Sequence, residues 1–144
     1  MKVPFNTKHF LVTILIVSIW INASEVFRYF VLVIPKVKDY WNNLESIADM
    51  NWIIFSIWGL WDTLLTTFIV FISWLCFQVF DKIKSIAIAS LLGWMLFVLF
   101  WIAAANMGFS SWSLLWITLP LGLFEMIIAT YICYFIFTKK YHYV

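Results

Sequence analysis

The chain has 144 residues, of which 65% are hydrophobic and 11% are charged, and it carries a net charge of +2. Its mean hydropathy of +1.00 excludes an ordinary water-soluble domain, because too few polar residues remain to cover a surface. The basic residues are scattered and form no patch, which excludes nucleic-acid binding. We expect one all-α integral membrane domain over residues 1–144, with the lipid bilayer as its solvent.

Four apolar runs are long enough to cross the roughly 30 Å hydrocarbon core of a bilayer as helices. The predicted spans are 10–34, 52–80, 85–105 and 112–137. Charged residues stand after the first, second and fourth runs, and short polar joints separate all of them. The sequence therefore predicts a four-transmembrane-helix bundle.

Lysines are unevenly divided between the two ends of the predicted spans. One side carries Lys2, Lys8, Lys82, Lys84, Lys139 and Lys140, and the other carries Lys36 and Lys38. Because basic residues are retained on the cytoplasmic side, both termini are predicted to be cytoplasmic.

The segment between the first two spans has its own amphipathic pattern. Apolar residues recur there at helical spacing, at Val37, Tyr40, Trp41, Leu44, Ile47 and Ala48. This pattern predicts a short interfacial helix on the outer surface, with Pro35 permitting the turn out of the first span. The alternative is a first helix that continues past the membrane with a kink, and the sequence does not decide between the two.

Small and polar residues at helical spacing mark the faces on which helices pack in lipid. The clearest stripe lies on the fourth span and consists of Thr118, Gly122, Glu125, Ala129 and Cys133. Weaker stripes run along the other spans, at Ser18, Asn22, Glu25 and Tyr29, at Gly59, Asp62, Thr63, Thr66 and Ser73, and at Ser90, Gly93 and Ala104. We expect these faces to meet at a common interior.

Four ionisable residues lie inside the predicted spans, where burial is costly and usually marks a functional site. They are Glu25, Arg28, Asp62 and Glu125. At 1.5 Å per residue, the three carboxyls lie roughly 14 to 20 Å below the outer surface, which predicts one shared pocket. Arg28 follows Glu25 by three residues, so the two are expected to form an ion pair.

One cation facing three carboxyls leaves two of them without an internal partner. In a medium of low dielectric, such groups take up protons or hold a bound cation. We therefore predict a substrate or ion site formed by Glu25, Arg28, Asp62, Glu125, Asn22, Thr66 and Asn106. The alternative is that protonated carboxyls only tie the helices together through hydrogen bonds to Thr66, Thr118 or Asn22.

Several of the ten tryptophans lie at the depth of the acids in the outer half. They are Trp58, Trp61, Trp101 and Trp116, which we name as a possible aromatic lining for a cationic or flat hydrophobic ligand. The alternative is that they pack against helices or face lipid.

No catalytic residues, metal ligands or cofactor are predicted. His9 and His142 lie at the two ends of the chain, away from the buried acids, and Cys76 and Cys133 form no CxxC motif. An enzyme is therefore the less expected class.

These features favour a transporter or channel-forming subunit that binds protons or a cationic substrate in an outward-facing intramembrane cavity. A homo-oligomer or a partner membrane subunit is expected, because four helices alone enclose little space. The alternatives are a protein that binds a small amphipathic or lipid-like ligand, an isomerase-type enzyme acting on one, or an accessory subunit that assembles a larger membrane complex.

Overall fold

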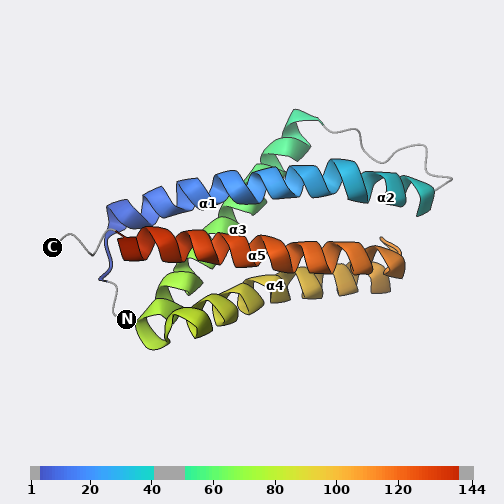
Figure 1. Ribbon diagram of the computed structural model, residues 1–144. Helices are drawn as coiled ribbons and strands as arrows, with labels where there is room; N and C mark the ends of the chain where they lie inside the picture. The colour runs from blue at the N-terminus through green and yellow to red at the C-terminus, as the bar shows by residue number, and fades with distance from the viewer. Residues whose placement is uncertain (1–3, 41–50, 140–144) are drawn as a thin grey trace.

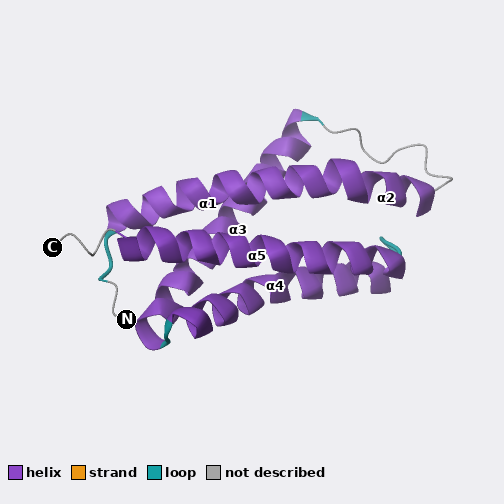
Figure 2. Ribbon diagram, in the orientation of Figure 1, coloured by secondary structure: helices purple, strands orange, loops and turns teal. Residues whose placement is uncertain are grey.

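The structure, a computed structural model, describes residues 4–40 and 51–139, and every regular element in this part of the chain is helical (Figure 2). The elements are α1 (Thr7–Phe27), the π-helix η1 (Arg28–Val33), α2 (Ile34–Tyr40), α3 (Trp52–Val79), α4 (Lys82–Asn106) and α5 (Trp112–Lys139). Since α1, η1 and α2 follow one another without a break, they form a first long helix. Four helices are long and apolar enough to cross a membrane, as the sequence predicted.

Helix α3 crosses the bundle at a steep tilt, whereas α1, α4 and α5 run along its length (Figure 1). Both α3 and α5 pack against all three of the other long helices, with α1 and α4 on opposite sides of them. The tilt carries the N-terminal end of α3 away from α4 and α5 (Figure 1). The bundle is therefore tightly packed toward one end and splayed toward the other.

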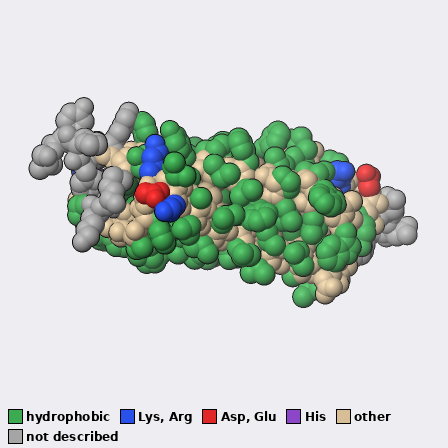
Figure 3. Space-filling view, turned by 60° about the horizontal axis from the view of Figure 1, so that its bottom comes forward, with side chains coloured by type: hydrophobic (Ala, Val, Ile, Leu, Met, Phe, Trp, Pro, Cys, Tyr) green, Lys and Arg blue, Asp and Glu red, His purple; other side chains and the backbone are tan. Residues whose placement is uncertain are grey.

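On the face shown in Figure 3, the exposed charged side chains lie at the two ends of the bundle, with a broad hydrophobic belt between them. The start of α1, the end of α5 and the turn between α3 and α4 lie at one end, and α2 and the turn between α4 and α5 lie at the other (Figure 1). We call these the turn end and the α2 end. Which of them faces the cytoplasm stays a prediction.

The observed bounds of α3, α4 and α5 agree with the predicted spans to within three residues. Polar residues cap the starts of α1, α3 and α4. Asn6, Asn51 and Asp81 each accept a hydrogen bond from the backbone N–H three residues further on, at 3.0 to 3.1 Å. At Asp81 this hydrogen bond also holds the pKa of the carboxyl below its usual value.

The first helix continues through Pro35 to Tyr40, beyond the predicted end of the span at residue 34 and in agreement with the alternative of a continuous first helix. The π-helical turns before the proline explain this. A proline ring disrupts the usual hydrogen bonds between residues i and i−4 of an α-helix. Here the Ile34 N–H already donates to Tyr29 O, five residues back, so the π-helical pattern has replaced those bonds before Pro35. The chain therefore does not turn out of the helix at Pro35. The rest of the predicted interfacial helix, residues 41–49, lies outside the described residues.

The small and polar stripe of α5 faces the interior, as predicted: Thr118, Gly122, Glu125, Ala129 and Cys133 are all buried. On α3 the prediction holds for Asp62, Thr66 and Ser73, which are buried. It fails for Thr63, whose side chain is exposed because it lies about 100° around the helix from Asp62.

Three helices approach one another closely at Gly93 of α4. A methyl group at this position would lie 2.6 Å from Ile69 Cδ1 of α3 and 2.8 Å from Met126 Sδ of α5. Both side chains are fully buried in the core and would have to shift to accept it. The packing of the turn end therefore depends on the missing side chain at Gly93.

We predict that Gly93→Ala lowers the free energy of unfolding by about 1–3 kcal/mol, because the added methyl overpacks the core. Gly59→Ala is the matched control, since it changes the same residue type within α3 where a methyl meets nothing within 4 Å. That control is expected to be neutral or to stabilise the helix by about 0.5–1 kcal/mol. Unfolding by sodium dodecyl sulfate, followed by circular dichroism, measures both, and equal effects would contradict the packing at Gly93.

Candidate functional site

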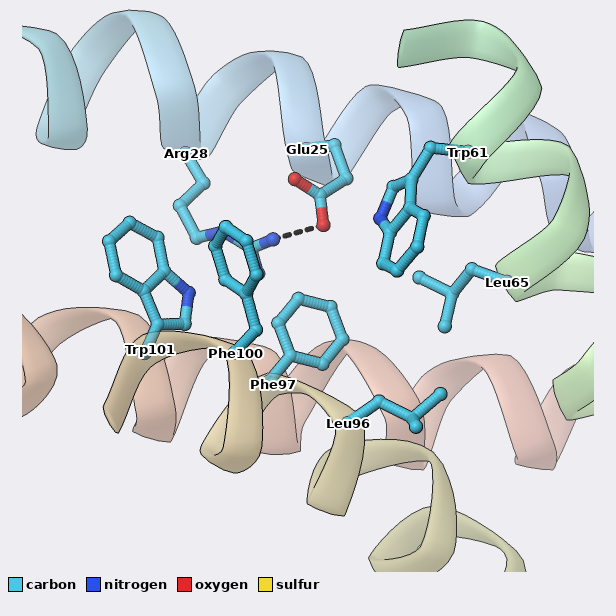
Figure 4. Close-up of a pocket in the computed structure, with 8 residues that line it drawn as sticks. All are labelled: Glu25, Arg28, Trp61, Leu65, Leu96, Phe97, Phe100 and Trp101. Atoms are coloured by element: carbon cyan, nitrogen blue, oxygen red, sulfur yellow. Dashed lines mark hydrogen bonds and ion pairs between the residues drawn. The ribbon is translucent and has the colours of Figure 1, made fainter. Parts of the chain in front are cut away.

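Arg28, at the start of η1, is buried and forms ion pairs with two carboxylates on different helices. One partner is Glu25, a turn earlier in the same helix, which is the predicted pair (Figure 4). The other is Glu125 of α5, whose Oε2 lies 3.1 Å from Arg28 Nη1. The guanidinium group therefore links the first helix to α5.

Glu125 is held against the first helix by further contacts. Ser24 Oγ donates a hydrogen bond to Glu125 Oε2 at 2.6 Å, and Trp20 Nε1 donates to the backbone carbonyl of Glu125 at 3.1 Å. The second carboxylate oxygen, Oε1, has no hydrogen-bond partner among the described residues. Glu125 thus uses one oxygen to join two helices and leaves the other available.

Asp62 approaches the same region from α3 and is only 3% exposed. It lies close enough to Glu25 and Arg28 for their charges to act on it, and it in turn acts on Glu125. Its Oδ1 has no hydrogen-bond partner within the described part of the chain. All three carboxyls therefore converge on one interior region, with a single guanidinium among them.

Thr66 lies one turn after Asp62 and is fully buried. Nearby threonines of α3 satisfy their hydroxyls on their own helix, since Thr63 and Thr67 donate to the carbonyls four residues earlier. Thr66 Oγ1 instead has no hydrogen-bond partner in the described structure. An unsatisfied hydroxyl and an unsatisfied carboxylate oxygen thus lie on adjacent turns of one helix.

A cavity of about 80 Å³ lies between the acidic cluster and α4 (Figure 4). Glu25 and Arg28 are its charged lining residues, and two leucines and four aromatic residues form the rest of its wall. The aromatic residues are Trp61, Phe97, Phe100 and Trp101. The cavity therefore combines a charged edge, formed by the ion pair of Glu25 and Arg28, with apolar walls.

Phe97 forms the part of this wall beneath Arg28, whose guanidinium carbon lies 4.7 Å from the ring centroid. This is a cation–π contact, which stabilises the buried cation further. The ring fits because α5 has a glycine opposite it: a methyl group on Gly122 would lie 3.2 Å from Phe97 Cγ. Gly122, which the sequence suggested as a packing residue, thus also positions a wall of the cavity.

The cavity is open at the side of the bundle and closed toward the turn end. Trp61 and Phe100 form its mouth and are 54% and 57% exposed. Ile21, Ile69 and Met126, all fully buried, fill the core beyond the acids. The described residues of one chain therefore enclose a side pocket rather than a passage from end to end.

The remaining predicted site residues differ in their distance from the cavity and in their exposure. Trp58 lines an adjoining cavity of about 230 Å³, which also contacts Glu25 and Arg28. Asn22 is half-buried and donates to Ser18 of its own helix. Asn106 and Trp116 are exposed, Trp116 at 84%, and neither lines the acidic cavity.

Sequence reasoning missed three features of this site. Ser24 and Phe97 contact the charged cluster, but neither stands out by residue type or spacing within its span. The π-helix at Arg28 was also unforeseen, although the proline that follows it, Pro35, is a visible signal. Such turns are frequent at functional sites.

Within residues 4–40 and 51–139, no group of three or more His, Cys, Asp or Glu side chains is placed to hold one metal ion. No protein-family model, curated protein or solved structure matches this chain. The chemistry of the cluster is therefore the guide to function: its unpaired oxygens can accept a proton or the N–H groups of an organic cation.

We predict that Arg28→Met lowers the free energy of unfolding by about 3–5 kcal/mol, because it leaves Glu25 and Glu125 buried without a cation. Adding Glu125→Gln to this variant is expected to restore part of the loss, since one stranded charge is removed. Equilibrium unfolding of the two single variants and the double variant gives the coupling energy.

Lys84→Met is the matched control, because it breaks a surface ion pair with Asp81, in which Nζ and Oδ2 are 3.3 Å apart and both side chains are exposed. No measurable change in stability is expected there. Strictly additive effects of Arg28→Met and Glu125→Gln would show that the ion pair across the two helices is absent.

Proposed function

We propose that this chain is a membrane transport protein, acting as a transporter or channel-forming subunit, whose buried carboxyls bind protons or a cationic substrate. The observation that carries the proposal is the set of buried, unpartnered oxygens on Asp62, Thr66 and Glu125, in the interior region where the three carboxyls converge. Leaving a buried acceptor unpaired costs about 1–3 kcal/mol. Oxygens kept in this state at one place are best explained by an occupant that they bind.

The charge of the site favours a positive occupant. Arg28 is engaged by Glu25 and Glu125, so its charge is already shared between two carboxylates. Asp62 adds a third carboxyl with no cation of its own. The lack of a metal-binding group among the described residues favours protons or an organic cation over a chelated metal ion.

The proposed location is a cellular membrane, with both termini in the cytoplasm and the cavity in the outer half. The orientation rests on the lysines of the turn end, among them Lys8, Lys82 and Lys84, which a cytoplasmic surface favours. Because the core beyond the acids is filled, transport across the membrane requires a change of conformation or a second subunit. A homo-oligomer or a partner membrane protein supplies such a subunit.

A second candidate function is the binding of a lipid-like molecule, which the exposed rings of Trp61 and Phe100 favour because they place the mouth of the cavity at the side of the bundle. In that case Asp62 and Glu125 are the groups available as acid and base for an isomerase-type reaction. Transport is preferred for the following reason. An acid–base reaction on a lipid needs only Asp62 and Glu125, and it leaves the contacts of Arg28 with two carboxylates without a role.

We predict that Asp62→Asn lowers proton flux about tenfold or more in liposomes that contain the purified protein, because it removes the carboxyl of the buried cluster that has no paired cation. The flux is driven by a potassium diffusion potential and followed with an internal pH-sensitive dye. Uptake of radiolabelled tetramethylammonium, measured in parallel, tests for a cationic substrate. Asp81→Asn is the matched control, since it makes the same change at an exposed position where asparagine still caps the helix.

The outcomes separate the function classes. Wild-type liposomes that move neither protons nor tetramethylammonium above the level of empty liposomes would overturn transport. Equal flux in the wild type and Asp62→Asn would remove this site from the pathway. Loss of the folded protein or of its oligomer in Asp62→Asn, but not in Asp81→Asn, would indicate an assembly role instead.

A further inference from the structure

The walls of the acidic cavity distinguish between kinds of cation. Its lining has a charged edge, Glu25 and Arg28, and is otherwise hydrophobic. An inorganic ion loses its water in such a site without gaining enough oxygen ligands to replace it. A ligand with one charged nitrogen and an apolar body is stabilised by both parts of the lining, because aromatic faces attract ammonium groups and also bury hydrocarbon.

We propose that the ligand is an amphipathic ammonium ion, with its charged nitrogen at the carboxyl of Glu25 and its apolar body among Trp61, Phe100 and Trp101. This inference rests on the proposed function, whose cationic substrate it specifies. Glu25 lines the cavity directly. Asp62 does not line it, but it is buried three residues before the lining residue Leu65 on α3 and lies close enough to Glu25 for their charges to interact. The charge of a second, unpaired carboxyl therefore also acts on a nitrogen held at Glu25.

The space available suits an elongated molecule rather than a compact one. The cavity beside Glu25 is continued by the second cavity of about 230 Å³, because both are lined by Glu25, Arg28, Phe100 and Trp101. Tyr29 and Trp58 form its far wall, with ring centroids 4.5 Å apart in an edge-on arrangement. One aromatic ring and a short alkyl chain fit this shape.

The route into the cavity also selects an amphipathic ligand. Its mouth opens at the side of the bundle, where Trp61 and Phe100 are more than half exposed. These rings lie on long apolar helices, within the part of each helix that is expected to be surrounded by lipid. A molecule that dissolves in the bilayer reaches this mouth directly, whereas a small hydrophilic ion does not.

The test compares three compounds that share one ring and one chain of four carbons or their equivalent: 4-phenylbutylammonium, 4-phenylbutanol and 4-phenylbutyrate. The full chain is placed in nanodiscs of phosphatidylcholine, and binding is measured by equilibrium dialysis against empty nanodiscs. The ammonium ion is expected to bind saturably and about tenfold more tightly than the alcohol, because only it gains a charge-assisted hydrogen bond. The carboxylate is expected not to bind.

Two variants separate the roles of charge and wall. Asp62→Asn is expected to remove most of the preference for ammonium over alcohol while leaving binding of the alcohol unchanged. Trp61→Leu is expected to weaken the binding of both compounds by a similar factor. The variant is expected to fold, because Trp61 is half exposed. The matched controls are Asp81→Asn and Trp116→Leu, which make the same kinds of change away from the cavity.

Equal binding of the three compounds, tighter binding of the carboxylate, or an ammonium preference that survives in Asp62→Asn would overturn the inference. Failure here is distinguishable from failure of the proposed function. Proton flux that depends on Asp62 without ammonium binding would leave transport standing and remove this ligand class. Saturable ammonium binding without any flux would establish the ligand and remove transport.

Discussion

The contact of Arg28 with Glu25 and Glu125 is the constraint around which the rest of the structure is arranged. A guanidinium in an apolar interior is stable only if its donors are paired, and two carboxylates from different helices do this. The Ser24 and Trp20 contacts to Glu125 then fix the first helix against α5 at the same level. Burial of one cation thereby sets the relative position of two long helices.

The sizes of the side chains explain why the bundle is closed at one end and open at the other. On the turn-end half of α4 the buried positions are small, at Ser85, Ala89, Ser90 and Gly93, so the helices approach closely. On the other half, where Phe97 and Ala105 are buried, the positions that line the cavity carry the large side chains of Phe97, Phe100 and Trp101, which separate α4 from α3 and the first helix there. The cavity therefore follows from the order of small and large residues along one helix.

Residue patterns within one helix predicted its local features well, whereas the contacts between helices were not predictable from the sequence. The length of the spans, the buried stripe of α5 and the pair of Glu25 with Arg28 depend on local spacing and were predictable. The rotation of a helix is set by its neighbours, so depth alone placed Trp101 and Trp116 together although only Trp101 lines the cavity. The same holds for Glu125, whose pairing with Arg28 crosses 97 positions of sequence.

The neighbouring residues Trp61 and Asp62 connect these observations to the proposed chemistry. Successive residues of a helix point about 100° apart, so the tryptophan is exposed at the mouth while the aspartate is buried beside the acids. A rotation or change of tilt of α3 would move both at once, because they share a backbone. The position of α3, whose N-terminal end is splayed from the bundle (Figure 1), therefore sets the placement of both the tryptophan at the mouth and the third carboxyl of the cluster.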